Sequence, residues 1–225
     1  VRVRVNPPAP APAEANSLST FGRLTPLPGR RYPAARSTGA PLQLIPKVTI
    51  LDGAQMRRVV RRMAGEILEH TGGSADLILV GIRTRGVPLA EALARELEQM
   101  EGRQVPIGSL DITLYRDDLS TIGPHPVVRS SHIPGPVDGR VLVLCDDVLY
   151  TGRTVRAALD ALRDYGRPRR VELAVLIDRG HRELPVQADI VGRRVPTSTQ
   201  EEIRVSFEAT DGVDKVEILG REEPA

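Results

Sequence analysis

Short apolar runs that alternate with helical patterns are the feature that most limits the fold of this chain. Leu77–Ile82, Arg140–Cys145 and Val171–Ile177 are almost continuously aliphatic, which is typical of strands buried on both faces. Between these runs, residues 86–100 and 154–165 have the pattern of helices. The alternation predicts an α/β fold, in which an open, mostly parallel sheet carries helices on both faces.

The segment before the first apolar run predicts a helix with a basic face. Val48–Leu51 indicates a short strand, and Asp52 is placed to cap a helix that extends to about His70. The apolar side chains of this helix share one face, and a stripe of arginines occupies the opposite face. These are Arg57, Arg58, Arg61 and Arg62. An exposed helix face and a surface for nucleic-acid phosphates both fit this stripe.

The remaining segments predict shorter elements and one long loop. Further strands are expected at Val105–Leu114, Ile190–Val195, Glu202–Phe207 and Val216–Leu219. Residues 116–139 hold four prolines and no periodicity. A loop of this length is usually a lid or a binding loop.

The first 46 residues differ in composition from the rest of the chain. They contain nine of the 19 prolines and six arginines against one glutamate, whereas the remainder has 25 basic and 28 acidic residues. We expect residues 1–46 to be a disordered leader and residues 47–225 to form the domain. Three origins fit the leader: an interaction tail, an organelle transit segment, or translated sequence upstream of the true start.

Composition excludes several classes of protein. Cys145 is the single cysteine, which excludes a disulfide framework and a cysteine-based zinc site. The longest clean apolar run, Val141–Cys145, is far shorter than the ~18 residues of a membrane span. We therefore expect a cytoplasmic protein without a membrane partner.

The junction after the Arg140–Cys145 run carries the strongest chemical signal. Asp146 and Asp147 follow it directly, and the turn Thr151-Gly-Arg-Thr154 then precedes a helix. Backbone N–H groups and hydroxyls at a helix N-terminus form an anion site. Carboxylates just upstream can accept hydrogen bonds from hydroxyls, so the string predicts a site for a ribose phosphate.

This string resembles the phosphoribosyl-pyrophosphate (PRPP) loop of the type I phosphoribosyltransferases. The tetrapeptide at residues 148–151 is similar to that of the PyrR family, whose members are uracil phosphoribosyltransferases and RNA-binding regulators of pyrimidine operons. Segments 81–86, 111–119, 178–185 and 195–198 resemble the same family. The resemblance implies the type I phosphoribosyltransferase fold with a small hood at about residues 178–200.

The resemblance also implies roles for residues of the PRPP loop. Asp146 and Asp147 would hold the 2′ and 3′ hydroxyls of the ribose. The surrounding residues expected to bind PRPP or nucleotide are Val148, Leu149, Tyr150, Thr151, Gly152, Arg153 and Thr154. Glycine suits position 152, because a side chain there would obstruct the approach of a phosphate to the backbone.

Three other regions receive roles in the same way. Thr84 and Arg85 lie where the family has its diphosphate loop, which often contains a non-proline cis peptide. Arg85 and the acid pair would be the catalytic residues, and Arg85 would offset the charge of the leaving diphosphate. Arg179 and Ile203 would contact uracil in the hood. Tyr115, Arg116 and Asp117 would begin the lid.

The implied partners are uracil, PRPP, UMP or UTP, and the leader mRNA of a pyrimidine operon. Mg²⁺ would arrive with PRPP rather than at a fixed protein site, and the protein would form a homodimer or tetramer. The expected RNA contacts are the arginine stripe and Arg182. Where the family's RNA-contacting helix carries small polar and histidine residues, this chain has Arg61 and Gly65.

Three kinds of function therefore remain open, the second in two forms. The first is an enzyme that also regulates by binding RNA. The second is a salvage enzyme that has lost RNA binding, or a regulator that uses the site only as a nucleotide sensor. The third is a transferase for another base, such as hypoxanthine or orotate, although the string at residues 178–184 favours uracil.

Overall fold

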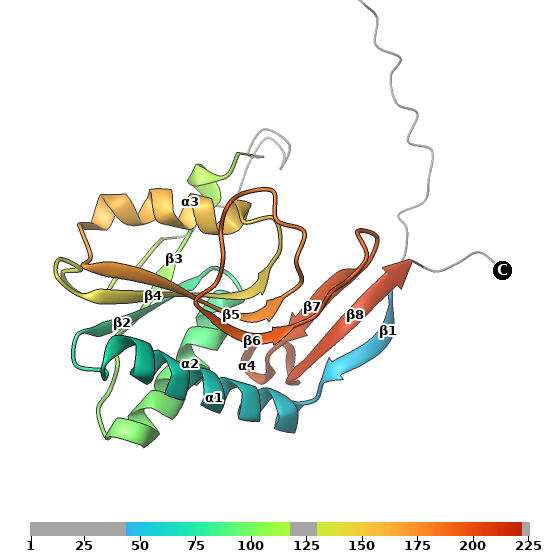
Figure 1. Ribbon diagram of the computed structural model, residues 1–225, viewed down its shortest axis with the longest axis horizontal. Coiled ribbons are helices and arrows are strands. Elements are labelled where there is room, and N and C mark those ends of the chain that lie inside the picture. The colour runs from blue at the N-terminus through green and yellow to red at the C-terminus, as the bar shows by residue number, and fades with distance from the viewer. Residues whose placement is uncertain (1–43, 118–129, 222–225) are drawn as a thin grey trace, which may run out of the picture. The chain divides into compact units, whose positions relative to one another are not determined.

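The computed structural model of the protein describes residues 44–117 and 130–221 (Figure 1). Residues 1–43 of the expected leader and residues 118–129 of the expected lid lie outside this description. The leader was expected to end at residue 46, but strand β1 already begins at Leu44. It does so because Leu44, Ile45 and Pro46 pair with residues 219–221 of the last strand.

A five-stranded parallel sheet forms the centre of the domain, in the order β3-β2-β4-β5-β6. The strands are β2 (Leu77–Ile82), β3 (Ile107–Leu110), β4 (Val141–Leu149), β5 (Arg170–Asp178) and β6 (Ile190–Arg194). Every neighbouring pair in this sheet is parallel. The predicted α/β fold is confirmed, and the carboxyl ends of all five strands meet at one edge.

Helices cover both faces of the sheet. Helices α1 (Gly53–Thr71) and α2 (Gly86–Glu101) lie on one face, and α3 (Arg153–Leu162) lies on the other (Figure 1). Alternate residues along β2 serve the two layers: Leu79 packs with the α1 and α2 side chains, and Val80 with those of α3. Asp52 caps α1 as predicted, through a reciprocal pair of hydrogen bonds with Gln55.

A small antiparallel sheet adjoins the α1/α2 side of the domain and forms the hood. Its order is β1 (Leu44–Leu51), β8 (Lys215–Arg221) and β7 (Glu202–Ser206), and the short helix α4 (Glu208–Asp211) connects β7 to β8. The expected hood range, 178–200, instead forms the β5–β6 loop, β6 and the lead into β7. The strand pattern could not reveal this pairing, because β1 and β8 come from opposite ends of the domain.

Within the parallel sheet, β3 and β4 differ by several residues from their predicted lengths. The strand expected over residues 105–114 ends at Leu110, because the Asp111 carboxylate accepts hydrogen bonds from the Thr113 N–H and hydroxyl and turns the chain. In contrast, β4 continues past Cys145 to Leu149. Its partner β5 is long enough to pair with it, with Val148 opposite Ile177. Asp146 and Asp147 therefore lie within the strand rather than in the turn after it.

The lengths and compositions of the helices were compared with those of membrane-spanning helices. Among residues 44–117 and 130–221, no helix has the length and apolar content that a bilayer span requires.

Gly86 offers a test of how closely α2 must approach β4. A Cβ added at Gly86 would lie 2.1 Å from the Cys145 carbonyl oxygen. Overpacking against backbone costs about 1–3 kcal/mol, so we expect Gly86→Ala to lower the melting temperature by about 2–10 °C. Differential scanning calorimetry measures the change. The control is Gly65→Ala in α1, whose Cβ would meet no atom within 4 Å, and which should leave the melting temperature equal or slightly raised. Equal melting temperatures for the two variants would contradict the close approach.

Candidate active site

The loops at the carboxyl ends of the parallel strands enclose two adjoining hollows. One, of about 670 Å³, is lined by the end of β4, the turn before α3, Arg116, Asp117 and Glu183. The other, of about 490 Å³, is lined by residues 83–85, Asp111, the acid pair and neighbouring residues. Both include Asp146 and Thr154 in their walls. Ligands of open α/β sheets bind at this edge, so the hollows form the candidate site.

The acid pair joins the two halves of the site, since Asp146 lines both hollows and Asp147 lines the smaller one. Asp146 is only 7% exposed and Asp147 is half-buried. Burial raises the pKa of both carboxyl groups, and the charge of Asp147 raises the pKa of Asp146 further. Arg85 opposes this shift by lowering the pKa of Asp147. The backbone N–H groups of Asp147 and Val148 donate to the carboxylates of Asp146 and Asp147, at 3.0 Å each. Hydroxyl donors from a ligand would supply further hydrogen bonds to this buried charge.

The turn between β4 and α3 presents backbone N–H groups to the larger hollow. The Leu149 carbonyl accepts from the Arg179 N–H, the Tyr150 carbonyl from the Arg182 guanidinium, and the Thr151 carbonyl from the Glu183 N–H, at 2.8–3.2 Å. The β5–β6 loop thereby engages the carbonyl side of the turn. Within the described residues, the N–H groups of Gly152 and Thr154 have no acceptor.

Gly152 is required at this turn for two reasons. Its φ of +91° is a conformation that residues with side chains rarely adopt, and an added Cβ would lie 3.2 Å from the Cβ of Val186. The turn also opens helix α3, whose N-terminus favours negative charge. Free N–H groups, two threonine hydroxyls and a helix N-terminus together suit a phosphate group.

Arg153 links this turn to the start of the lid. Its guanidinium bonds Asp117 at 2.5 Å and Glu183 at 2.7–2.8 Å, and Arg156 lies 3.4 Å from Asp117. The Tyr115 hydroxyl donates to Asp164, in the short helical turn that follows α3. Arg116 lines both hollows. Of the three lid residues expected from the sequence, Arg116 and Asp117 therefore line the site, whereas Tyr115 lines neither hollow.

The loop between β2 and α2 forms the far wall of the smaller hollow. The peptide bond between Arg83 and Thr84 is cis, as the resemblance implies. Thr84 is exposed in the hollow, whereas Arg83 donates to the Ser109 hydroxyl at 2.8 Å. The Arg85 guanidinium reaches across to the small sheet, where it bonds the Val205 carbonyl and both oxygens of Asp211.

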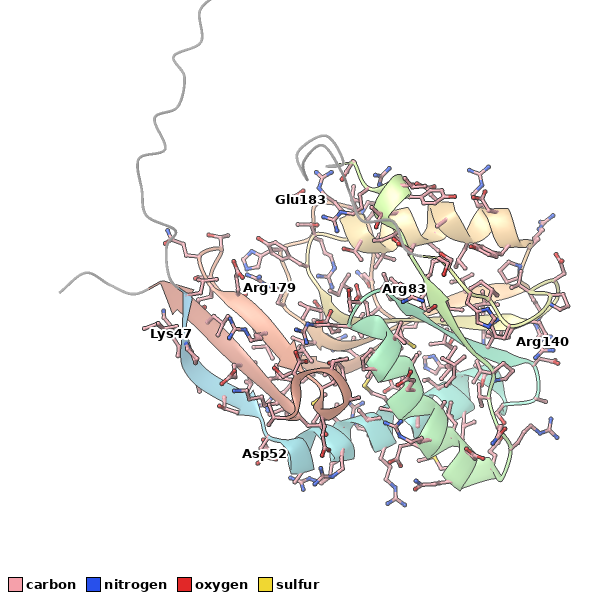
Figure 2. All side chains as sticks on the ribbon, turned by 180° about the vertical axis from the view of Figure 1, so that it is seen from behind. Lys47, Asp52, Arg83, Arg140, Arg179 and Glu183 are labelled. Carbon is pink, nitrogen blue, oxygen red and sulfur yellow. The ribbon has the colours of Figure 1, made fainter. Side chains whose placement is uncertain are left out.

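The two residues expected over the base line neither hollow. Arg179 is buried where the small sheet meets the body of the domain (Figure 2). Its guanidinium lies 4.1 Å from the centre of the Tyr150 ring and donates to Thr197, Ser198 and Glu201. Ile203 is partly buried against the core. In this arrangement Arg179 supports the Tyr150 ring.

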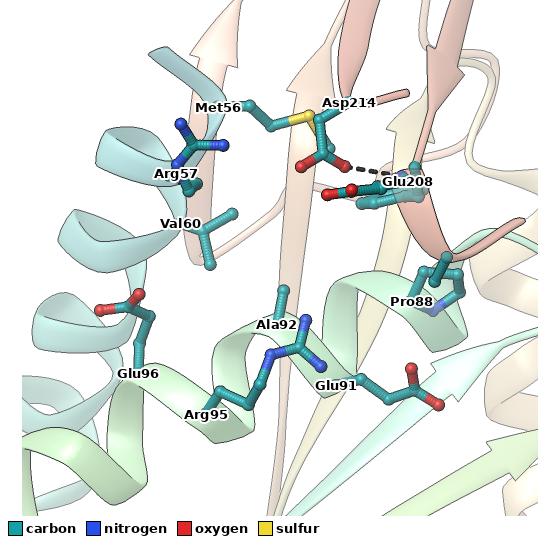
Figure 3. Close-up of a pocket in the computed structure, with 12 residues that line it drawn as sticks. Met56, Arg57, Val60, Pro88, Glu91, Ala92, Arg95, Glu96, Glu208 and Asp214 are labelled. Atoms are coloured by element: carbon teal, nitrogen blue, oxygen red, sulfur yellow. Dashed lines mark hydrogen bonds between the residues drawn. The ribbon is translucent and has the colours of Figure 1, made fainter. Parts of the chain in front are cut away.

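The residues expected to contact RNA fall into two groups. Arg58 and Arg61 are exposed on α1, and Arg57 lines a separate hollow of about 420 Å³ between α1, α2 and α4 (Figure 3). Arg62 and Arg182, in contrast, are engaged by the protein itself. Arg62 donates to the carbonyls of residues 191 and 192 and to Glu66, and Arg182 to four backbone carbonyls and Asp178.

Sequence reasoning missed the supporting residues of the site. Arg182 was expected only as an RNA contact, and Glu183 and Asp211 received no role. For Arg182 and Glu183 a signal existed, since both lie in the string at residues 178–185 that resembles the family. Nothing in the sequence marked Asp211, whose contact with Arg85 spans 126 residues.

The described residues contain no group of three histidine, cysteine, aspartate or glutamate side chains arranged to hold a metal ion. Mg²⁺ that binds together with a phosphorylated substrate usually needs only one or two carboxylates from the protein. The oxygens of Asp146 and Asp147 can supply these, so the residues fit an ion that a diphosphate brings with it.

The buried acid pair leads to a stability prediction. The pKa of Asp146 lies above its value in the unfolded chain, so ionisation of Asp146 costs stability as the pH rises through the interval between the two values. We expect Asp146→Asn to melt no lower than the parent at pH 7.5, with any gain shrinking towards pH 4. Thermal melts over this pH range measure the effect. Asp160→Asn, on the exposed side of α3, is the control and should change little. A melting temperature several degrees below the parent at pH 7.5 would contradict the account.

Comparison with known proteins agrees with this geometry. Residues 48–208 match the family model described as "Phosphoribosyl transferase domain". The chain is 59% identical over 173 residues to the "Bifunctional protein PyrR" of Pelotomaculum thermopropionicum, covering 77% of this chain and 96% of the relative. It is 57% identical over 176 residues to the protein of that name from Thermus thermophilus, covering 78% of this chain and 97% of the relative.

Solved structures share the fold at low identity. The hypoxanthine phosphoribosyltransferase of Trypanosoma cruzi superposes with a TM-score of 0.60 and 16% identity, over 79% of this chain and 98% of the other. This similarity shows the type I phosphoribosyltransferase fold. Together with the close relatives and the matched strings, it confirms the resemblance found in the sequence: the chain belongs to the PyrR family.

Proposed function

We propose that the protein transfers the phosphoribosyl group of PRPP to uracil, giving UMP and diphosphate, and that it regulates pyrimidine-operon expression by binding leader mRNA. The observation that carries the enzymatic half is the acid pair placed between an anion-binding turn and the loop that bears Thr84 and Arg85. The family of the chain supports both halves. A homodimer or tetramer belongs to the same proposal.

Each part of PRPP finds a complementary group. The 5′-phosphate would accept hydrogen bonds from the N–H groups and hydroxyls of the turn at residues 151–154. The ribose hydroxyls would donate to Asp146 and Asp147, whose buried charge favours such donors. The diphosphate would lie in the smaller hollow beside Thr84 and Arg85.

The proposed phosphoribosyl transfer requires that the protein stabilise charge and position the reactants. The bond from ribose C1 to the diphosphate oxygen breaks, the bond from C1 to uracil N1 forms, and the N1 proton is released. Positive charge develops on the sugar and negative charge on the leaving group, so fixed charges on both sides lower the barrier. Mg²⁺ bound with PRPP would offset part of the diphosphate charge. Asp146 and Asp147 would stabilise the sugar, and the lid that begins at Tyr115 would exclude water.

The choice of uracil as the base is proposed from the loop that follows β5. The string at residues 178–185 shapes the outside of the PRPP turn through hydrogen bonds to residues 149–151. Arg179 also fixes the Tyr150 ring from above. In this proposal the base would lie beside this loop, next to the ribose bound at the end of β4.

Regulation through RNA would use the exposed part of the arginine stripe. Arg58 and Arg61 project from α1 and are bound to no other group of the described chain. Arg62 and Arg182 would instead act indirectly, because their guanidinium groups are already bonded within the protein. Loss of RNA binding with intact catalysis is the second candidate, favoured by Arg61 and Gly65 where the family carries small polar and histidine residues.

The enzymatic proposal predicts the effect of removing both site charges. We expect Asp146→Asn combined with Asp147→Asn to lower UMP formation by at least ~100-fold, because the ribose loses its charged acceptors. Conversion of radiolabelled uracil with PRPP and Mg²⁺ measures the loss, and circular dichroism checks the fold. Asp160→Asn should keep full activity. Parent-level activity in the folded double variant would overturn the site assignment.

The regulatory proposal predicts that RNA binding can be weakened without loss of catalysis. Arg58→Gln combined with Arg61→Gln should weaken binding to the operon leader RNA and reduce the slope of log affinity against log salt by about 1.5, since each phosphate contact contributes about 0.7–0.9. UMP formation should stay at the parent rate. Arg103→Gln, at the exposed end of α2, is the matched control. Unchanged RNA affinity in the double variant would exclude this face, and absent binding by the parent would establish the salvage enzyme instead.

A further inference from the structure

Arg85 belongs to the active-site loop but is held by the small sheet. Its guanidinium donates to Asp211 through two nitrogens, at 2.6 and 3.2 Å, and to the Val205 carbonyl at 2.7 Å. Val205 is part of β7 and Asp211 ends α4. The paired geometry matches the planar fork of arginine to the two oxygens of a carboxylate, which fixes direction as well as distance.

Asp211 is itself held rigidly. Its Oδ2 accepts hydrogen bonds from the Phe207 N–H at 3.0 Å and the Thr210 hydroxyl at 2.9 Å. With Arg85, these donors hold the pKa of Asp211 far below its ordinary value, so the carboxylate stays charged at neutral pH. Because these hydrogen bonds hold the Asp211 carboxylate in place, Asp211 can hold the Arg85 guanidinium in place in turn.

The position of Arg85 matters because a second carboxylate faces it. Arg85, Asp146 and Asp147 line the same hollow, and the charge of Arg85 lowers the pKa of Asp147. Without Asp211, the guanidinium would be free to turn towards the acid pair. It would then leave the side of the hollow where a diphosphate would lie.

We propose that Asp211 is a positioning residue, which holds Arg85 at the diphosphate side of the site and away from Asp147. It acts through Arg85 and does not contact substrate. The inference rests on the proposed function, since it concerns the binding of PRPP at that site. It also gives the small sheet a role in the reaction, because β7 and α4 carry the anchor.

The test compares two ligands that differ in the diphosphate. Asp211→Asn should weaken PRPP binding in the presence of Mg²⁺ by about tenfold, measured by calorimetry and by KM for PRPP. UMP, which has the same ribose and phosphate but no diphosphate, should bind within about twofold of the parent. KM for uracil should also stay within about twofold, whereas a general loss of structure would weaken all three ligands.

Asp214→Asn provides the matched control. Asp214 lies three residues further on, accepts from the Glu208 N–H at 2.8 Å and lines the separate hollow of Figure 3, without contact to Arg85. It should leave PRPP binding unchanged. Arg85→Lys, which keeps the charge but loses the fork, should resemble Asp211→Asn. The combined variant should be no worse than Arg85→Lys alone, because the two residues act as one unit.

Three results would overturn the inference: equal losses for PRPP and UMP in Asp211→Asn, unchanged or tighter PRPP binding in it, or multiplicative losses in the combined variant. Failure of the proposed function would look different. In that case the parent itself would neither bind PRPP nor form UMP, whatever the residue at position 211.

Discussion

The pairing of β4 with β5 beyond the apolar part of both strands is the constraint on which the site depends. Because the two strands continue to Leu149 and Asp178, the acid pair is carried on rigid sheet backbone. The carboxyl groups are consequently held in a buried environment, which raises their pKa values and leaves their oxygens in need of hydrogen-bond donors from a ligand. A pair of carboxyl groups on a mobile loop would instead turn into solvent, where water supplies the donors.

The loop after β5 holds the turn that follows the paired part of β4. Its backbone and Arg182 occupy the carbonyls of residues 149–151, so the N–H groups at the start of α3 remain available to an anion. The same loop carries Arg179 onto Tyr150 and Glu183 onto Arg153. Three parts of the proposed chemistry, the phosphate turn, the base region and the lid, are therefore connected through one segment of nine residues, 178–186.

Local patterns in the sequence predicted much of this structure. The buried strand Leu77–Ile82 and the capped helix that begins after Asp52 follow from aliphatic runs and from hydrogen-bonding side chains at fixed spacing. The turn proposed to bind PRPP could be singled out because its residues are contiguous. The small sheet could not be assembled from the pattern, because residues 44–51 and 215–221 are short strands with no local sign of their pairing. For the same reason the contact of Arg85 with Asp211 appears only in three dimensions.

The central claim is that the protein transfers the phosphoribosyl group of PRPP to uracil. Its preference among bases tests this claim most directly. The parent protein, supplied with PRPP and Mg²⁺, would be offered uracil, hypoxanthine and orotate in parallel, with nucleotide and diphosphate both quantified. The account predicts UMP and diphosphate in equal amounts from uracil, and little or no nucleotide from the other two bases. Nucleotide formed preferentially from hypoxanthine or orotate, or diphosphate released without any nucleotide, would contradict it.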